Sequence, residues 1–341
     1  MSGPVATIAM DVNEDAGIDD VSDIGAQLRA LIGQGVAPAR LLTHARILIE
    51  VDLIRRSIEQ GDDDWEIRVI SSLHRLVKIE ERAPEDYAGT IDGYTSSDEI
   101  FPEDLVAFWS FDANTNETKT NTAPTTSVGS SLVDGGVRGK ALSLNNGFLY
   151  YATQFPQFKT DALKSWSIST WIKILNNGSK RTMLFQLARP GMFNGSINFA
   201  LNTNANPATN TDILRIQPTF STVGGGTQDN LNNNLSPKIG MDKWTHLVLT
   251  YDETSGVFNI WADAVKVGGF PNRGTGNNLF KSYEPNEVII GANYNGIPGK
   301  TVSTDTNFAP MTGQVDELRV YDRVLPDAHI RALFNLGKAN K

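Results

Sequence analysis

The spacing of apolar residues changes once along this chain, and the change divides the chain into two parts. Between residues 21 and 84, apolar side chains recur at intervals of three and four, which is the period of an amphipathic helix. Gly33, Gly35 and Gly61 interrupt the pattern, so it predicts three helices. A helical module of this size either forms a small bundle or completes its core with a partner or a second copy.

The segments on either side of the helical module are polar. Residues 1–20 are acidic, and we expect a flexible arm there. Residues 85–104 are rich in Gly, Ser, Thr and acidic side chains, which is typical of a linker. The start of the chain has no basic region ahead of its short apolar run, so we expect no secretory signal in it, unless one was removed. No apolar run reaches about 18 residues, so we expect no membrane span.

From residue 105 onward the pattern is that of strands. Short runs rich in β-branched and aromatic residues alternate with turn signals such as Asn145-Asn146-Gly147. The runs that we expect to be strands are 105–112, 141–144, 148–153, 166–174, 183–187, 197–201, 213–217, 244–251, 257–262, 287–291 and 313–320. We expect one short helix over 326–336, stopped by Gly337. The fold class is therefore a small helical module followed by an antiparallel two-sheet jelly-roll sandwich over residues 105–341.

The last predicted strand carries two adjacent acidic residues. Strict alternation places Asp316 on a face with apolar side chains, and it places Glu317 beside Arg319 on the other face as an ordinary solvated pair. A buried carboxylate is costly unless a cation or several donors satisfy it, so Asp316 needs a partner elsewhere in the chain. Because alternation separates Asp316 from Glu317, the two are not expected to act as an acid/base pair.

Composition supports the division into two parts. The first 99 residues hold 20 acidic and 9 basic side chains, whereas the rest of the chain holds 19 acidic and 21 basic ones. The net charge of -9 thus belongs to the helical part, and neither part carries a basic stripe, which argues against nucleic-acid binding. The chain has no cysteine, which excludes disulfides, thiolate metal sites and cysteine nucleophiles.

Five motifs in the β part, taken together, resemble one known family. They are Leu105–Asp112, Gly136–Leu144, Trp166–Ile172, Trp244–Asp252 and Gly313–Leu325. In this order over residues 105–336 they resemble the laminin-G-like members of the concanavalin A-like lectin/glucanase fold. Residues 1–99 match no family that we recognise. Members of this family are mostly non-catalytic modules that bind glycans or proteins, and they often hold a structural calcium ion. The resemblance implies the same properties for this chain.

The resemblance also implies where calcium would bind. Asp112 and Asp316 match family positions that commonly face each other at such a site. Independently, Asp112, Asn114 and Asn116 alternate as oxygen ligands do in a tight loop, although Glu117 stands where a helix-loop-helix calcium loop needs glycine. We therefore expect a structural Ca²⁺ at Asp112, Asn114, Asn116 and Asp316. The alternative is that the carboxylates accept backbone and hydroxyl hydrogen bonds.

Binding is favoured over catalysis. Glycosidases of this fold need paired carboxylates, and no acidic triad of the Glu-x-Asp-x-x-Glu kind occurs here. His246 lies among apolar neighbours and is interpreted as a core residue. A sugar site needs an aromatic platform with amide and hydroxyl partners, whereas the strand tryptophans are expected to be mainly core. The candidate glycan-binding residues are Arg189, Phe193, Asn194, Tyr283, Tyr294 and Asn295.

The sequence thus predicts a non-enzymatic glycan-binding or adhesion protein. Residues 21–84 would anchor it, through a protein partner or through self-association, and the sandwich would bind a glycan or cell-surface polysaccharide. One alternative is a phage virion component, of the capsid-decoration or head-fibre type, whose jelly roll contacts host glycans. Both hypotheses place the protein outside the cell or on a virion surface. A glycoside hydrolase of the same fold is the least favoured alternative.

Overall fold

The computed structural model describes residues 89–152, 155–158, 163–175, 180–202, 214–220, 238–240, 242–271 and 287–341. The chain divides into two compact units, Met1–Thr95 and Ser96–Lys341. The acidic arm and the three helices predicted before residue 85 lie outside the described residues and stay predictions. No helix in the described part of the chain is long and apolar enough to cross a membrane.

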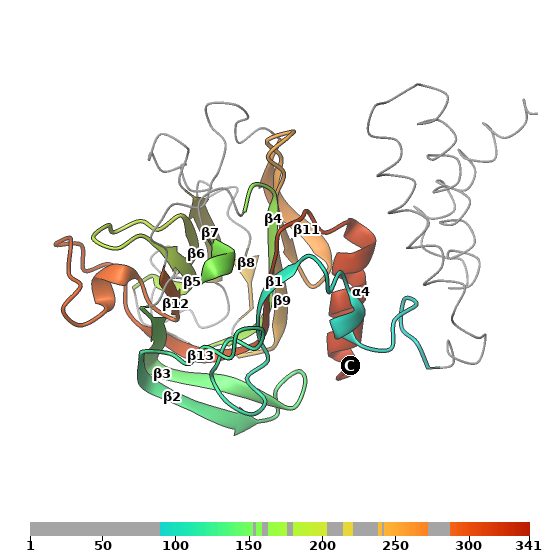
Figure 1. The fold of residues 1–341 in the computed structure, drawn as a ribbon, viewed down its shortest axis with the longest axis horizontal. Coiled ribbons are helices and arrows are strands. Elements are labelled where there is room, and N and C mark those ends of the chain that lie inside the picture. Colours follow the sequence, from blue (N-terminus) through green and yellow to red (C-terminus); the bar gives the residue numbers. More distant parts are fainter. Residues whose placement is uncertain are drawn as a thin grey trace, which may run out of the picture. The chain divides into compact units, whose positions relative to one another are not determined.

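The second unit consists mainly of antiparallel strands (Figure 1). In chain order the strands are β1 (Leu105–Trp109), β2 (Thr126–Asp134), β3 (Lys140–Tyr151), β4 (Trp166–Ile174), β5 (Thr182–Ala188), β6 (Ile197–Asn202), β7 (Leu214–Phe220), β8 (Lys238–Ile239), β9 (Thr245–Tyr251), β10 (Phe258–Ala262), β11 (Val265–Phe270), β12 (Glu287–Ile290) and β13 (Met311–Tyr321). The helical elements are the short turns η3 (Ser97–Glu99), η4 (Pro156–Phe158) and η6 (Tyr294–Gly296), and the helix α4 (Asp327–Lys338).

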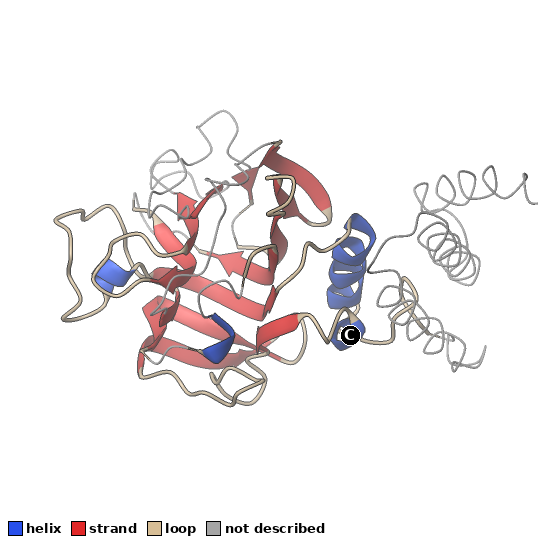
Figure 2. Cartoon of the chain, turned by 45° about the horizontal axis from the view of Figure 1, so that its top comes forward, coloured by secondary structure: helices blue, strands red, loops and turns tan. Residues whose placement is uncertain are grey.

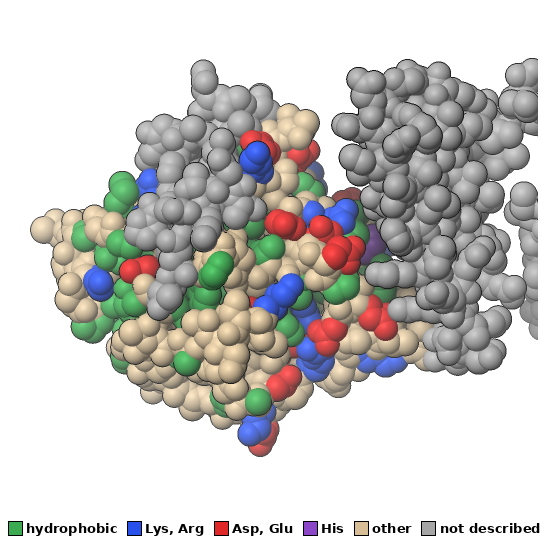
Figure 3. Space-filling view, viewed as in Figure 1, with side chains coloured by type: hydrophobic (Ala, Val, Ile, Leu, Met, Phe, Trp, Pro, Cys, Tyr) green, Lys and Arg blue, Asp and Glu red, His purple; other side chains and the backbone are tan. Residues whose placement is uncertain are grey.

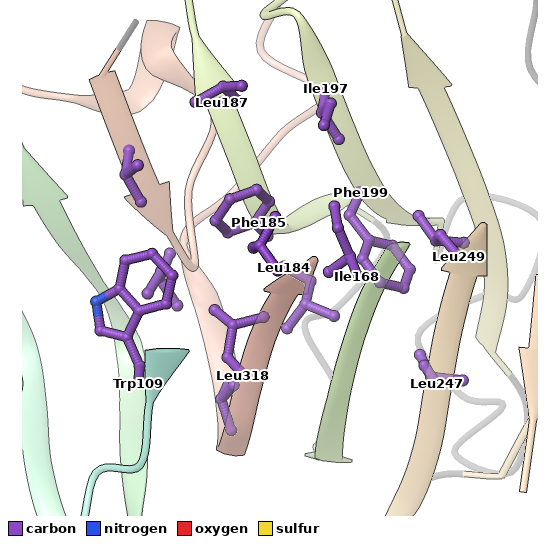
Figure 4. Close-up of a cluster of buried hydrophobic side chains, with 14 of the residues drawn as sticks. Trp109, Ile168, Leu184, Phe185, Leu187, Ile197, Phe199, Leu247, Leu249 and Leu318 are labelled. Carbon is purple, nitrogen blue, oxygen red and sulfur yellow. The ribbon is translucent and has the colours of Figure 1, made fainter. Parts of the chain in front are cut away.

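The described strands form one hydrogen-bonded sheet, where the sequence predicts two. Its order is β11-β10-β9-β4-β13-β3-β12-β5-β6-β7-β8, with β1 paired to β13 and β2 paired to β3. Ile168 of β4, Leu247 of β9, Leu184 of β5 and Phe199 of β6 nevertheless belong to the same buried cluster (Figure 4). The sheet therefore folds over one apolar core, in a jelly-roll-like arrangement.

Strand β3 bends where a turn is predicted. Its first half pairs with β13, with Leu144 opposite Gly313, and its second half pairs with β12, with Leu149 opposite Ile290. Between the halves, Asn146 has a φ of +48°, and a Cβ on Gly147 would lie 2.4 Å from a backbone oxygen of β2. A left-handed residue followed by a close backbone approach allows a strand to bend without leaving its sheet. The predicted turn is therefore a kink inside one continuous strand.

Strand β13 contains one extra residue relative to β4. Asp316 lies opposite Trp171 and Arg319 lies opposite Ser169, so three steps along β13 match two steps along β4. Glu317 has a φ of +50°, which marks the bulge. The alternation predicted for this strand is wrong because it assumes an unbroken period of two.

The bulge changes which side chains of β13 face the core. Val315 and Leu318 both belong to the main buried cluster, although they are three positions apart. Asp316 and Glu317 occupy the two positions between them, on the side of the sheet where Arg319 also lies. The closing strand thus directs both acidic side chains to the same side, away from the apolar core.

Helix α4 packs beside the sheet (Figure 2). It buries an apolar stripe that includes Ile330, Leu333 and Leu336. The prediction that Gly337 stops the helix is wrong, because α4 continues through Lys338. Gly337 instead allows close packing, since a Cβ at this position would lie 2.6 Å from the ring of Trp171.

Candidate functional site

Asp316 is fully buried and bonds to the turn that precedes β3. Its Oδ2 accepts the backbone N–H groups of Val137 at 2.7 Å and Arg138 at 3.1 Å, and its Oδ1 accepts the N–H of Glu317 at 2.8 Å. Burial, followed by the charge of Glu317, raises the pKa of Asp316 to about 8, although these three donors favour its charged form. The partner that a buried Asp316 requires is thus supplied by backbone N–H groups.

Asp112 bonds to the other end of the same turn. Its Oδ1 accepts the N–H of Lys140 at 3.0 Å, and a Cβ on Gly139 would lie 2.0 Å from that oxygen. We call Asp112, Asp316 and residues 136–140 the clasp. The two acidic residues that the family resemblance pairs are therefore connected through a glycine-rich turn. Only glycine at position 139 lets this turn come so close to Asp112.

The four predicted calcium ligands already make hydrogen bonds within the chain. Asn114 Oδ1 accepts the N–H of Asn116 at 2.8 Å, and Asn116 Nδ2 donates to Asn121 Oδ1 at 2.8 Å. One carboxylate oxygen of Asp112 and one of Asp316 accept hydrogen bonds from backbone N–H groups of the clasp. In the described part of the chain no three His, Cys, Asp or Glu side chains form a group suited to a metal. Calcium at these residues stays a prediction.

Next to the clasp lies the charged cluster, which we define as Asp98, Arg138, Glu317 and Arg319. Glu317 lies 2.5 Å from Arg319 and 3.2 Å from Arg138, and Asp98 lies 2.9 Å from each arginine. The side chains of Glu317 and Arg319 are each 3% exposed, so the predicted solvated pair is wrong. The bulge places Glu317 beside Arg319, and η3 then supplies Asp98 to both arginines.

The charges in the cluster balance one another. Burial raises the pKa of Glu317, and the charges of Arg319 and Arg138 offset part of that rise. Burial also acts to raise the pKa of Asp98, but the hydrogen bond from Arg138 and the charge of Arg319 outweigh it, so the pKa is lowered. The hollow beside the cluster admits no water-sized molecule. The cluster is therefore an ion-pair network that is buried at Glu317 and Arg319 and reaches solvent at Asp98, whose side chain is 54% exposed.

The predicted glycan-binding residues come from two loops that the structure joins. Arg189 Nε and Nη2 both donate to the carbonyl of Asn194 at 3.3 Å. The ring of Phe193 packs edge-on against Phe308, with 5.7 Å between centroids. The Phe193 carbonyl also accepts the side-chain N–H of Asn293 from the second loop at 3.1 Å.

In the second loop, Tyr294 is 3% exposed and belongs to a small buried cluster beneath the loops. Asn295 Oδ1 accepts the N–H groups of Val302 and Ser303 at 2.8 Å each, and its Nδ2 donates to the Asp305 carbonyl at 3.2 Å. The predicted residues that the structure brings together, named here the loop cluster, are Arg189, Phe193, Asn194, Tyr294 and Asn295. Tyr283 lies outside the described residues. Whether the loop cluster binds a ligand stays a prediction.

A groove beside α4 was not predicted from the sequence. Its volume is about 420 Å³. Its lining consists of residues 135–137, Gly337, Trp171, Trp244, Phe334, Asp263, Lys338 and Asn340. Trp244, expected in the core with the other strand tryptophans, is only half-buried because it precedes the first residue of β9. Its place at the end of the run was the available signal, but nothing in the sequence links it to Phe334.

His246 lies behind this groove and is a core residue, as predicted. It is 1% exposed, its Nε2 lies 2.8 Å from Ser169 Oγ, and its ring packs at a tilt against Trp171, with 5.0 Å between centroids. Burial, with a smaller effect from the charge of Arg319, lowers the pKa of His246 to about 3. A neutral imidazole enclosed in this way has no access to a substrate.

On the visible face of the molecule, acidic and basic side chains lie interspersed (Figure 3).

One region of the chain matches a family model. A family model described as the concanavalin A-like lectin/glucanases superfamily, Laminin_G_3, matches residues 149–331. Among curated proteins, an uncharacterized HTH-type transcriptional regulator, BphR, of Paraburkholderia xenovorans strain LB400 is 34% identical over 86 residues, or 24% of this chain. The matched part is 35% of that relative, which is too small a share to define a family for this chain.

Similar solved structures match about two thirds of this chain and between 33% and 97% of their own length. They include the binding domain of Paraclostridial Mosquitocidal Protein 1, at 15% identity and a TM-score of 0.48, covering 68% of this chain and 52% of that one. Domain 4 of AbnA, a GH43 extracellular arabinanase from Geobacillus stearothermophilus in complex with arabinotriose, has 20% identity and a TM-score of 0.40, covering 67% and 97%. Trypanosoma rangeli sialidase has 15% identity and a TM-score of 0.44, covering 69% and 33%. Similarity at this level concerns the fold alone.

Proposed function

This chain belongs to the concanavalin A-like lectin/glucanases superfamily, and on that premise we propose that its β unit is a non-catalytic module that binds glycans. The family match carries the proposal, because it spans more than half of the chain. The superfamily's name covers both lectins, which bind sugars, and glucanases, which cleave them. The choice between the two roles therefore depends on the acidic residues of this chain.

The acidic residues of β13 support binding. A retaining glycosidase needs two carboxyl groups about 5 Å apart that both reach the substrate. The bulge places Asp316 and Glu317 on one side of the sheet, so alternation no longer separates them. Their burial does exclude them from substrate, since Asp316 is 0% exposed and Glu317 is 3% exposed. Each is held by the chain itself, in the clasp and in the charged cluster respectively.

A glycan array probed with the full chain tests the proposal. We expect binding to a limited set of glycans, followed by no release of product when each bound glycan is incubated with the protein. Turnover of any bound glycan would show that the protein is a glycosidase and would overturn the non-catalytic role. A blank array together with no turnover would move the chain towards a purely structural role.

The compositional break near residue 100 favours a second proposal, on the protein as a whole. The acidic segment before it would anchor the β unit through residues 21–84, by self-association or through a protein partner, as in a surface adhesin or a phage virion component. Light scattering of the full chain tests self-association. Neighbouring genes separate the two settings, since capsid and tail genes indicate a virion and polysaccharide-utilisation genes indicate a cell surface.

Calcium binding remains a separate proposal that rests on the family resemblance. If Asp112, Asn114, Asn116 and Asp316 hold Ca²⁺, EDTA lowers the melting temperature of the full chain, and added calcium restores it. If the hydrogen bonds of the clasp alone satisfy these carboxylates, EDTA leaves the melting temperature unchanged. An unchanged melting temperature would remove calcium from the proposed function without affecting glycan binding.

A further inference from the structure

We propose that the groove beside α4 is the glycan-binding site of this chain and that it takes a neutral sugar residue. The inference rests on the proposed function for the class of ligand, and it adds the place and the charge of that ligand. The volume of about 420 Å³ lies within the range of small-ligand sites, which is about 300–1,000 Å³. The predicted loop cluster is thereby replaced as the binding site.

Aromatic rings form the apolar part of the groove. Phe334 of α4 is half-buried and stacks on Trp171 with 5.6 Å between centroids and 13° between ring planes. Trp244 is also half-buried, and its indole N–H donates to the Gly135 carbonyl at 3.3 Å, which fixes the orientation of the ring. Partly exposed aromatic rings held in one position suit the apolar C–H face of a sugar ring.

Polar groups in the groove remain available to hydroxyl groups. Asp263 Oδ1 accepts the N–H of His246 at 2.9 Å, whereas its Oδ2 forms no hydrogen bond with the described residues. Lys338 lies over the Phe334 ring, with its Nζ 5.4 Å from the centroid, and Asn340 is exposed. A carboxylate, an ammonium group and an amide provide both donors and acceptors. One negative and one positive charge in the lining favour a ligand without net charge.

The groove is also preorganised. Asp263 and Ala264 have φ values of +49° and +61° in the two-residue turn between β10 and β11. The N–H of Asp263 donates to the His246 carbonyl at 2.8 Å, so two hydrogen bonds hold the turn against β9. Trp171 is 5% exposed and packs against Gly337. Groups held on rigid elements lose little freedom on binding, which favours affinity.

The first test uses the full chain on the glycan array, with variants that separate the two candidate sites. Trp244→Ala removes an aromatic wall of the groove, and we expect it to weaken binding about tenfold or more. Phe193→Ala removes the half-buried aromatic side chain of the loop cluster and should leave binding within about twofold. Met192→Ala, at a neighbouring side chain that is 45% exposed, is the matched surface control.

A conservative variant tests the role of the carboxylate. Asp263→Asn keeps the oxygen that accepts the His246 N–H and replaces only the acceptor at Oδ2, so we expect about threefold to thirtyfold weaker binding with unchanged folding. If wild-type protein binds and Trp244→Ala binds equally well, the groove proposal is overturned while the proposed function survives. Loss of binding in Phe193→Ala alone would return the site to the loop cluster. Binding confined to sialylated or uronic-acid glycans would overturn the neutral ligand.

A second measurement decides the matter if the array is blank. We would titrate ¹⁵N-labelled full chain with glucose, galactose, mannose, arabinose and N-acetylglucosamine, and follow the indole N–H resonance of Trp244, assigned by its absence in Trp244→Phe. A saturable shift supports the groove as a weak sugar site. No shift with any probe, after a blank array, overturns both proposals. Self-association that Trp244→Ala abolishes, without any sugar effect, would assign the groove to a second copy of the chain.

Discussion

The charged cluster and the groove adjoin each other and share part of their lining, yet their polar groups differ. Those of the charged cluster are paired with one another, and those of the groove face open volume. Val137, Trp171 and Gly337 line both regions. In the charged cluster, Glu317 and Arg319 are each 3% exposed and paired with each other, and no water-sized space remains. In the groove, aromatic rings lie beside polar groups that face open volume. Buried polar residues that satisfy one another thus stabilise this fold, whereas polar residues with unused hydrogen-bonding groups are the better candidates for a binding site.

Removal of Arg319 from the charged cluster should destabilise the protein more than the variants that follow. Arg319→Ala leaves Glu317 buried without its 2.5 Å partner, and we expect the free energy of unfolding to fall by about 3–5 kcal/mol. Chemical denaturation measures the change. Arg331→Ala, at an exposed position on α4, is the matched control and should change stability by less than about 0.5 kcal/mol. If both variants behave alike, the cluster is not the structural network described above.

The next effect concerns the contact that the two regions share. Gly337→Ala places a Cβ 2.6 Å from the Trp171 ring, so overpacking should cost about 1–3 kcal/mol, reduced by the better helix propensity of alanine. Gly296→Ala is the control, because a Cβ there meets nothing within 4 Å. Equal melting temperatures for the two variants would show that α4 does not pack closely on Trp171.

Acid titration tests the enclosure of His246 behind the groove. Burial lowers its folded pKa to about 3, below the ordinary 6.5, so the unfolded state binds the proton first as the pH falls. The contribution of His246 to stability is therefore complete above pH 6.5 and declines towards pH 3, by about 1.4 kcal/mol per pH unit at most. Asp316, whose folded pKa is about 8, has the opposite sign between pH 8 and 4. The difference between wild type and His246→Gln, measured by denaturation at pH 7 and 5.5, isolates the histidine.

Truncation of Trp244 in the groove should change stability least. Trp244→Ala removes a half-buried ring, and we expect the free energy of unfolding to change by less than about 1 kcal/mol. Trp166→Ala, at a fully buried tryptophan, should cost about 3–5 kcal/mol. Thermal melts of the two variants therefore distinguish Trp244, as an aromatic residue available to a ligand, from a core residue such as Trp166. A large loss in Trp244→Ala would place Trp244 with the core tryptophans after all.

The strands that the sequence predicts well are those buried on both sides or clearly periodic. Strand β4 was predicted with its observed bounds, Trp166–Ile174, because a dense apolar and β-branched run leaves few alternatives. Strand β2 was missed because its Ser and Gly residues are largely exposed, and β11 was missed because three of its six residues are exposed. Such strands are fixed by pairing with a neighbour, and that pairing is not visible in their own sequence.

The sites were harder to predict than the fold, for two physical reasons. The bulge at Glu317 is a single-residue irregularity, and it reverses the face of every later residue in the strand. The groove combines Trp244 with Phe334, which are far apart in sequence and meet through the packing of α4. The loop residues had the right composition for a sugar site. Asn295, however, uses both side-chain atoms to hold its own loop.

The position of β13 has a consequence for how the protein is made. This strand lies between β4 and β3 in the sheet, although it follows every other strand in the chain. The ribosome therefore releases the middle of the sheet last, and β3 and β4 wait with unpaired edges until residues 311–321 have emerged. A chain truncated before Met311 lacks the strand that joins the two halves of the sheet. We expect such a fragment to aggregate or to be degraded, and not to persist as a smaller folded domain.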